Sequence, residues 1–478
     1  MKVLFHFIVK TFLVAAAIIG CSSLTFAQWS VPINLSPGAV SAILNESMGS
    51  CIGVSNDTLH VIWADRFNSK TGAIYYTRSV DTGLTWSAPV SITSLTGNAY
   101  NPAIAVNGKN IHVVWRVIDT ITQHRTSWYR HSPDGGNTWG AAIALDTSVA
   151  DWPAVAVSGN IVYVVNDIVT SQTPYNTEIF FLKSTDNGIT WSTHQQLTYA
   201  TGRSEDEAIS ARGNKIHMSW NDNRTGQMQI YYKESSDYGV SWGPDVAIVP
   251  PFDYGTMVSV DGANVDVPCA GAASGHYQIY LVQSADSGVS WGPAVNLTND
   301  PANTYYYPFL TRDGADLHLT YVKSGVGGQY LHSANGGISW SLPYNLGNSQ
   351  ITPFVAYTSC AVHIILPDSG RIKYFRNPTG NEGSHCNLTG ISSNSETNLV
   401  KVYPNPFEGQ ATIEILGAEN IEQAVLKIYN MLGGEILFSK FGNQRKLIVN
   451  SDKLGNGMYI YIVSEKDKVI ARGTFIVK

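Results

Sequence analysis

The chain is poor in charged residues and cysteines, and it lacks both long apolar runs and basic runs. Only 14% of its 478 residues are charged, and the net charge is −6. Without a basic run, a nucleic-acid partner is not expected. Beyond the N-terminus no apolar run reaches the roughly 20 residues that a membrane helix needs. The Cys and His spacings match no zinc motif, so we expect neither a metal site nor a cofactor.

Residues 1–27 have the pattern of an export signal. Lys2 and Lys10 are basic, Phe12–Gly20 is mostly apolar, and Ala27 offers a small residue for cleavage. The run that ends in Cys21 also resembles a lipoprotein cleavage site. We expect cleavage after Ala27, with the lipoprotein as the alternative.

Four cysteines remain in the exported chain, where disulfides are permitted. Cys269 occupies a strand position at which other repeats carry Trp, so we expect a buried free thiol. Cys360 and Cys386 are the pair that we expect to form a disulfide if one exists.

An octapeptide of the form Ser-x-Asp-x-Gly-x-Thr/Ser-Trp occurs six times. Its Trp residues are spaced by 53, 52, 51, 49 and 49 residues, which indicates repeated supersecondary units. Ser and Asp side chains accept backbone hydrogen bonds in tight turns, Gly permits positive φ, and Trp anchors the turn in a core. The acidic position is filled in turn by Asp81, Asp134, Asp186, Asp237, Asp286 and Asn335.

Each repeat predicts four antiparallel strands. A small-residue strand such as Pro102–Val106 precedes an apolar strand such as Ile111–Trp115. A third strand such as Ala73–Thr77 leads into the octapeptide, and a fourth such as Ala88–Ile92 follows it. Small inner strands and aromatic outer strands suit a radial array, so we predict an all-β fold with a β-propeller in residues 28–378.

The number of blades follows from the second strand, which has seven copies against six octapeptides. The last copy, within 353–375, has three strands and no octapeptide. Trp29–Ser36 mirrors Trp86–Thr93, a fourth strand. We therefore predict that the two ends of this region share one blade of a seven-bladed propeller, with six blades as the alternative.

The octapeptide resembles the Asp box, which occurs in sialidases and in many other β-propellers. The resemblance implies a structural turn rather than catalysis. Five histidines, at positions 60, 112, 217, 318 and 363, share one strand position in different repeats, so we expect packing or hydrogen bonding rather than a metal. The box should lie on the face that carries the loops between first and second strands. Function is then expected on the opposite face.

The last eighty residues differ in composition. After a Ser/Asn/Gly-rich linker at 379–398 comes a segment, 399–478, with no Trp and no box. The motif Tyr403–Pro406, the Gly457-Met458-Tyr459 turn and the final Lys478 resemble the C-terminal sorting domain of type IX secretion. The resemblance implies a small Ig-like β-sandwich, transport across the outer membrane, removal of the domain, and either release or surface attachment.

Polar and aromatic residues gather where second strands end and first strands begin. The candidates for ligand binding on this face are Arg66, Tyr100, Arg116, Trp152, Asp222 and Arg224. Neighbouring Asp and Arg residues, such as Asp65 with Arg66, could instead tie adjacent blades together.

The sialidase resemblance assigns roles to some of these residues. It implies Arg66, Arg116 and Arg224 as a carboxylate clamp, Tyr307 as nucleophile, Glu207 as its base and Asp65 as acid. The chain departs from the sialidase pattern in four ways. No Arg-Ile-Pro occurs, and the inner strand at 50–54 has no Arg. Sialidases have six blades where we predict seven, and Asp65 lies beside Arg66 rather than on a long loop after it.

Three hypotheses follow. The first is a secreted, monomeric propeller that binds a glycan or another extracellular ligand; the second is a sialidase-type glycoside hydrolase. The third is an adhesive or structural surface protein. In each case residues 399–478 would engage the type IX secretion machinery.

Overall fold

The computed structural model describes most of the chain. The described residues are 29–45, 49–68, 71–93, 98–119, 121–145, 150–249, 257–273, 275–359, 361–378, 380, 400–416, 424–430, 435–442, 444–465 and 468–478. They are almost entirely β-strand, with one 3₁₀ turn at Ser451–Lys453. No helix in these ranges is long and apolar enough to cross a bilayer.

Strand pairing divides residues 29–378 into four-stranded antiparallel units, which we number 1 to 7 and take as the blades of the propeller. Units 1 and 2 contain β3 (Ile52–Ser55), β4 (Thr58–Asn68), β5 (Thr71–Ser79), β6 (Val90–Ser91), β7 (Asn98–Asn107), β8 (Asn110–Ile118), β9 (Arg125–Ser132) and β10 (Ile143–Ala144). Units 3 and 4 contain β11 (Ala150–Ser158), β12 (Ile161–Gln172), β13 (Tyr175–Ser184), β14 (Gln195–Gln196), β15 (Ser204–Arg212), β16 (Lys215–Asp222), β17 (Gln229–Ser235) and β18 (Val246–Val249). Units 5 and 6 contain β19 (Ser259–Asp261), β20 (Asn264–Ala273), β21 (His276–Ser284), β22 (Val295–Asn296), β23 (Tyr305–Asp313), β24 (Asp316–Lys323), β25 (Gly327–Ser333) and β26 (Tyr344–Gly347). Unit 7 contains β27 (Phe354–Tyr357), β28 (Val362–Asp368), β29 (Arg371–Asn377) and, from the other end of the region, β1 (Ile33–Asn34).

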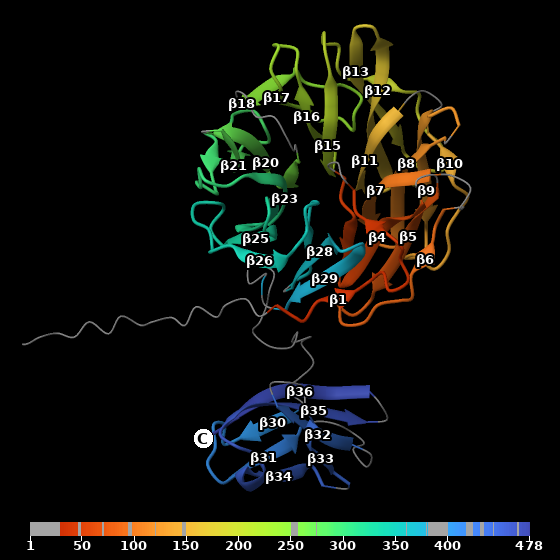
Figure 1. Cartoon of the computed structure of the whole chain (residues 1–478). Coiled ribbons are helices and arrows are strands. Elements are labelled where there is room, and N and C mark those ends of the chain that lie inside the picture. Colours follow the sequence, from red (N-terminus) through yellow and green to blue (C-terminus); the bar gives the residue numbers. More distant parts are fainter. Residues whose placement is uncertain are drawn as a thin grey trace, which may run out of the picture.

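The units follow one another around a common centre (Figure 1). The first strand of each unit contacts the first strand of the next, and β27 of unit 7 contacts β3 of unit 1. Strand β1 pairs with β29, with Ile33 opposite Tyr374. The prediction that the two ends of this region share a unit is therefore confirmed. A short strand, β2 (Ala42–Ile43), adds to the end of β4, and a single parallel bridge joins units 1 and 2 into one sheet.

Each Asp box is a turn closed by its own side chains. In the third box, Asp186 Oδ1 accepts hydrogen bonds from the backbone N–H groups of Ile189 (3.1 Å) and Thr190 (2.9 Å), and Oδ2 accepts one from Thr190 Oγ1 (2.6 Å). Ser184 Oγ accepts the Gly188 N–H at 2.8 Å. These hydrogen bonds lower the pKa of Asp186 to about 2. The turn-forming role of the boxes is confirmed.

The closing Trp of a box packs edge-on against an aromatic ring of the preceding unit. Five such pairs have ring centroids between 4.8 and 5.3 Å apart: Trp139 on Tyr76, Trp191 on Tyr129, Trp242 on Phe181, Trp291 on Tyr232, and Trp86 on Tyr374. The last pair joins the first box to unit 7. Trp29, which belongs to no box, packs in the same way on Tyr330 of unit 6 (5.0 Å). The box thus connects neighbouring units as well as reversing the chain.

The repeated histidines bond to the same tyrosines. Each histidine Nδ1 lies 2.6–2.9 Å from a tyrosine hydroxyl, in the pairs His60–Tyr76, His112–Tyr129, His217–Tyr232, His318–Tyr330 and His363–Tyr374. The expected packing and hydrogen-bonding role is confirmed. Burial disfavours the imidazolium form, and it lowers the pKa of His217 to about 4 and that of His112 to about 3.

The C-terminal segment forms two antiparallel sheets. One contains β30 (Val400–Tyr403), β31 (Gln410–Ile415) and β34 (Lys446–Asn450), and the other contains β32 (Ala424–Asn430), β33 (Glu435–Lys440), β35 (Gly457–Glu465) and β36 (Lys468–Val477). Ile413 and Val449 from the first sheet share an apolar core with Leu426 and Val463 from the second. The Ig-like topology stays a prediction.

The expectation for Cys269 is confirmed, since its thiol is free and fully buried, like that of Cys51. Cys360 and Cys386 lie outside the described residues, so their pairing stays a prediction. The linker at 379–398, apart from position 380, also lies outside them.

The contact between a box and the preceding unit can be tested with two glycines. Gly188 and Gly159 both have positive φ (85° and 62°), but a Cβ at Gly188 would overlap the Tyr129 hydroxyl, whereas a Cβ at Gly159 would meet nothing within 4 Å. We expect Gly159→Ala to lower the free energy of unfolding by about 1–2 kcal/mol through backbone strain alone. Gly188→Ala should cost about 1–3 kcal/mol more through overpacking. Urea unfolding of both variants measures the difference, and equal losses would contradict the proposed contact.

The buried histidines predict loss of stability in acid. An unfolded histidine has a pKa near 6.5, whereas His217 in the fold has one of about 4, so the unfolded state takes up the proton first as the pH falls. Stability is complete above pH 6.5 and is lost progressively below it, by about 2 kcal/mol per such histidine at pH 5. We expect His217→Gln to reduce the drop between pH 7.5 and pH 5, and His124→Gln, at a half-buried position, to leave it unchanged. Thermal unfolding at the two pH values measures the drop; the same drop in His217→Gln as in the parent would contradict this account.

Candidate functional site

The two faces of the ring can be told apart by hydrogen bonds. Backbone N–H groups of the boxes donate to carbonyl groups in the loops between first and second strands, as from Asn187 to Asn160 (3.0 Å) and from Thr82 to Asp57 (3.1 Å). The boxes and these loops therefore share one face, as expected. The opposite face, where first strands begin and second strands end, is called the entry face below.

Four first strands carry the same irregularity at the entry face. Each has a register shift near its beginning, in β7, β11, β15 and β23. The shifts contain four residues with φ between 46° and 56°, namely Asn101, Trp152, Asp206 and Tyr307. A left-handed backbone costs roughly 1–2 kcal/mol in a residue with a side chain, and such outliers gather at functional sites. Bulges also redirect side chains. We take the four bulges as the framework of the site.

A proline pattern in the sequence marks the positions of these bulges. In three of the four, the residue after the outlier is proline: Pro102, Pro153 and Pro308. In unit 4 the same place holds Glu207. A proline cannot donate to the ladder, so it marks an irregular position in a strand. Glu207 is thus the exception to the proline that follows the positive-φ residue in the other three bulges, and its surroundings are described below.

Two of the three predicted clamp arginines meet on one ring. The guanidinium carbon of Arg66 lies 4.2 Å from the centroid of the Tyr100 ring, and that of Arg116 lies 5.7 Å from it. Arg116 also lies 4.7 Å from the Trp152 ring. Arg116 pairs with Asp151 of the next unit, and Asp151 also pairs with Arg125. One aspartate therefore serves two arginines, and the alternative that Asp–Arg pairs tie units together holds for Arg116.

Arg66 is the less compensated cation of this group. Within the described ranges no carboxylate lies at ion-pair distance from it, and its buried Nε atom has no hydrogen-bond partner. Its side chain is half-buried at the end of β4. A guanidinium held in place on an aromatic face, with donors to spare, is suited to binding a carboxylate or a similar anion.

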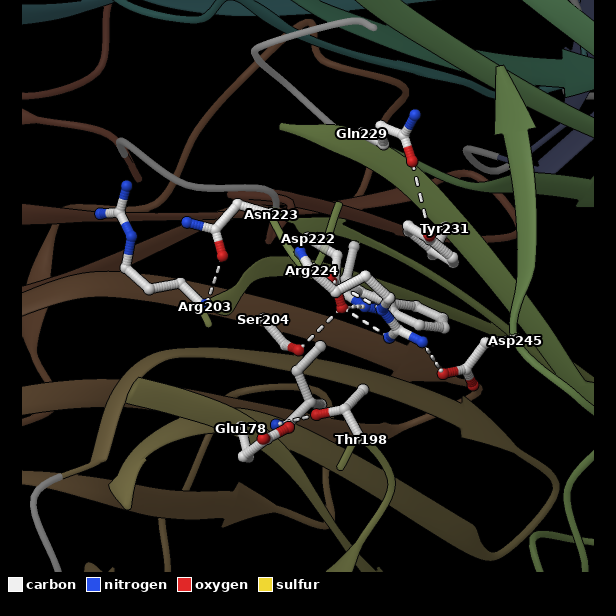
Figure 2. Close-up of polar contacts among 12 residues, drawn as sticks. Glu178, Thr198, Arg203, Ser204, Asp222, Asn223, Arg224, Gln229, Tyr231 and Asp245 are labelled. Atoms are coloured by element: carbon white, nitrogen blue, oxygen red, sulfur yellow. Dashed lines mark hydrogen bonds and ion pairs between the residues drawn. The ribbon is translucent and has the colours of Figure 1, made fainter. Parts of the chain in front are cut away.

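Arg224 lies in a different network, within unit 4. It donates from Nε to Asp222 Oδ1 (2.9 Å), from Nη2 to Asp222 Oδ2 (2.6 Å) and from Nη1 to Asp245 Oδ2 (2.8 Å), as Figure 2 shows. Its guanidinium also lies over Tyr231, at 4.3 Å. Burial would raise the pKa of Asp222, but the hydrogen bonds from Arg224 outweigh it and hold the pKa below its usual range. Asp222 and Arg224 therefore neutralise each other, and the structure does not bring them onto Tyr100 with the other two arginines.

Asp65 has a structural partner. Its carboxylate accepts hydrogen bonds from the backbone N–H groups of Val40 (3.0 and 3.1 Å) and Ser41 (2.7 Å), and its side chain is buried. The carboxylate thus fixes the segment that leads into β2. An acid already occupied in this way is a poor proton donor to a ligand.

Glu207 faces a second carboxyl group across the boundary between units 3 and 4. Its side chain is 1% exposed, and neither carboxylate oxygen has a hydrogen-bond partner among the described residues. Asp167, at the end of β12, is 4% exposed, and its Oδ1 likewise has none there. Burial raises the pKa of both groups well above the usual range; the Asp167 carboxylate raises that of Glu207 further, and Asp151, Asp206 and Glu205 raise that of Asp167. The protonated form of both carboxyl groups is therefore favoured relative to free carboxyl groups.

By comparison, the boundary between units 2 and 3 shows why the carboxyl groups of Asp167 and Glu207 are unusual. Aligned on their second strands, Arg116 of unit 2 and Asp167 of unit 3 occupy the same position. Arg116 meets an acid of the next unit, Asp151, and forms an ion pair, whereas Asp167 meets the acid Glu207. An ion pair thus lies at the boundary between units 2 and 3, whereas two carboxyl groups lie at the boundary between units 3 and 4.

Tyr307 is separated from Glu207 by one unit of the ring. It is in β23 of unit 6, whereas Glu207 is in β15 of unit 4, and the first strand of unit 5, β19, contacts both strands. The Tyr307 ring packs against that of Tyr306, with centroids 5.8 Å apart. Within the described residues no three His, Cys, Asp or Glu side chains form a group that could hold a metal ion.

A further cavity of about 580 Å³ lies between the first strands, toward the box face. Its wall is mixed, with apolar residues such as Ile52 and Leu310 beside polar ones such as Ser210. Arg312 at its edge is held by Asp266 in a two-point ion pair (2.5 and 2.8 Å). None of the predicted ligand-binding residues lines this cavity.

The carboxyl pair predicts a stabilising substitution. Glu207→Gln removes an acid whose pKa is raised by the fold, so the parent loses stability relative to the variant as the pH rises above about 4. We expect the variant to be more stable by about 1–3 kcal/mol at pH 8 and nearly unchanged at pH 4. Glu234→Gln, at a half-buried site, is the control and should show no such pH dependence. Chemical denaturation at the two pH values is the measurement; destabilisation at pH 8 would show that the ionised carboxylate is required.

Comparison with known families gives two matches. Residues 27–319 match the BNR repeat-like domain. Residues 401–478 match the secretion system C-terminal sorting domain. No curated protein gives a significant match.

Several solved structures resemble the chain distantly. A Hadza microbial sialidase is 16% identical with a TM-score of 0.45, over 62% of this chain and 66% of that one, just under two thirds of its length. A PL25 ulvan lyase bound to -[GlcA(1-4)Rha3S]- is 12% identical with a TM-score of 0.49, over 74% and 97%. The Trypanosoma rangeli sialidase in complex with the inhibitor DANA is 10% identical with a TM-score of 0.44, over 91% and 85%. These values indicate no more than a general similarity.

The repeated boxes, the four-stranded units and the family matches agree. The sorting domain indicates export by type IX secretion to the cell surface or the extracellular space. Because the BNR repeat-like domain spans more than half of the chain, this protein belongs to the family of BNR repeat-like proteins.

Proposed function

We propose that this exported protein binds a carbohydrate that carries an acidic group, and that it does so on the entry face at units 1 to 3. The observation that carries the proposal is the placement of Arg66 and Arg116 on the Tyr100 ring, beside Trp152. The acids of this group are already shared, since Asp151 serves both Arg116 and Arg125. A ligand carboxylate or sulfate would supply the missing negative charge.

The residue types suit such a ligand. Guanidinium groups bind planar carboxylates through two parallel hydrogen bonds, and stacking on a ring fixes their direction in advance. Trp152 is partly exposed, so its ring offers an apolar surface to a sugar. Its backbone is held at φ 47°, a conformation that a bulky residue seldom adopts. The free-energy cost of this backbone conformation is accounted for if the conformation turns the Trp152 ring toward the ligand.

Hydrolysis of a sialoside is the second candidate, and one observation favours it. Glu207 and Asp167 form a buried carboxyl pair whose protonated form is favoured by burial, and a proton donor is what glycosidic cleavage requires. Asp65 and Arg224, to which the sialidase resemblance also gives roles, already have other partners. Asp65 accepts hydrogen bonds from the backbone N–H groups of Val40 and Ser41, and Arg224 forms an ion pair with Asp222. Binding therefore requires fewer rearrangements than hydrolysis.

A glycan array probed with the full exported chain tests the proposal. We expect binding to glycans with carboxylated or sulfated sugars and none to their neutral counterparts. Arg66→Gln should weaken binding at least tenfold, because charge-assisted hydrogen bonds contribute about 1.5–3 kcal/mol each. Arg78→Gln, on β5 and bonded to the second box through Asn137, is the control and should bind normally.

Two outcomes would overturn the proposal. Absence of binding to every acidic glycan would favour an adhesive or structural role. Release of the fluorophore from a fluorogenic sialoside, lost in Tyr307→Phe, would establish the hydrolase instead.

A further inference from the structure

The entry face carries a second group of aromatic side chains, in units 5 and 6. Tyr277 begins β21, and Tyr306 and Tyr307 begin β23. Ring centroids are 5.5 Å apart between Tyr277 and Tyr306 and 5.8 Å apart between Tyr306 and Tyr307, with interplanar angles of 44° and 40°. Two neighbouring units thus contribute to one cluster of three tyrosines.

The cluster is more accessible to solvent than the aromatic rings that pack between units. All three tyrosines are only half-buried. The aromatic residues that pack between neighbouring units, such as Tyr232 and Tyr330, are almost completely buried. Tyr307 has φ 54°, and its bulge is equivalent to that of Trp152 in unit 3. The same backbone device therefore presents an aromatic ring at two places on the rim of the ring of first strands.

The charges around the two aromatic groups differ. Near the tyrosines, Lys323 pairs with Asp300 (3.5 Å), and Asp300 also accepts the Tyr305 hydroxyl (2.6 Å). These groups compensate one another. At units 1 to 3, Arg66 has no such acid in the described part of the chain. One side of the rim is therefore cationic, and the other is aromatic without excess charge.

We infer that the tyrosine cluster is a second subsite, for an uncharged sugar ring, and that the ligand is an oligosaccharide with an acidic sugar at one subsite and a neutral sugar at the other. This inference rests on the proposed function. Tyrosine rings present an apolar face with a polar hydroxyl at one end, which matches the alternating C–H and hydroxyl surfaces of a pyranose. An acidic monosaccharide fills only the cationic subsite. A longer ligand gains contacts at the tyrosines.

Titration calorimetry of the full exported chain compares short and long probes. The probes are N-acetylneuraminic acid against 3′-sialyllactose, and glucuronic acid against a hyaluronan tetrasaccharide. We expect the longer member of at least one pair to bind about tenfold or more tightly than the single sugar, a gain of about 1.4 kcal/mol. Tyr306→Ala and Tyr277→Ala should each remove most of this gain and leave the affinity for the single sugar unchanged.

The controls separate this inference from the function on which it rests. Arg66→Gln should weaken the short and the long probes alike, and Tyr199→Ala, at a 77% exposed tyrosine of the loop after β14, should change neither. If the single acidic sugar binds but the longer probe binds no better, the second subsite is wrong and the proposed function stands. If no probe binds, the second subsite is wrong, and the glycan array with its sulfated sugars decides the proposed function separately. Because Tyr277 and Tyr306 come from different units, a folding defect in one variant leaves the other as the test, and circular dichroism checks both.

Discussion

The structure depends on the contact between five of the six Asp boxes and an aromatic ring of the preceding unit. The box Gly lies against the tyrosine hydroxyl, the box Trp packs edge-on against the ring, and a buried histidine bonds the same hydroxyl from within its own unit. Aromatic pairs of this geometry contribute about 0.5–1.5 kcal/mol beyond the area that they bury. Since the contact recurs around the ring, it sets the angle between successive units and joins the last unit to the first through Tyr374 and Trp86.

This constraint explains why the box face is an unlikely place for ligand binding. The side chains of the boxes are occupied in closing turns, as Asp186 is with Ile189 and Thr190, and a box glycine such as Gly188 has no room for a substituent. The side chains at the entry face do not have to close turns of this kind. There the first strands depart from regular pairing, and the positive-φ residues Trp152 and Tyr307 turn large rings to the rim. Strain is tolerated at one end of the units because the other end is rigidly fixed.

Charge is distributed unevenly over the entry face. At the boundary of units 2 and 3 Arg116 and Asp151 compensate each other, while at the next boundary Asp167 and Glu207 do not. A buried carboxyl pair is costly unless it retains a proton, so this boundary is weaker at high pH. The same face thus combines an arginine without an ion-pair partner among the described residues, a buried carboxyl pair and two aromatic groups, which together are more typical of ligand binding than of packing.

Sequence patterns alone predicted the repeat, the four-stranded unit, the role of the boxes, the sharing of one unit by the two ends of the repeat region, and the type IX sorting domain. These follow from local patterns, because a turn or a strand alternation is specified by residues close together in the chain. The sequence also placed Arg66, Arg116, Tyr100 and Trp152 on one face.

Only the tertiary structure decided which candidates meet. Arg224 looked equivalent to Arg66, yet an acid two residues away binds it, and Asp65 looked like an acid for catalysis, yet the backbone of Val40 and Ser41 occupies its carboxylate. Asp65 binds backbone groups 25 and 24 residues away, and Glu207 interacts with Asp167 of another unit, 40 residues away (207 − 167); such distances in the chain carry no signal in a repeat pattern. The physical reason is that the repeat fixes the position of each residue within its unit, whereas the contacts across a boundary depend on how two divergent units pack.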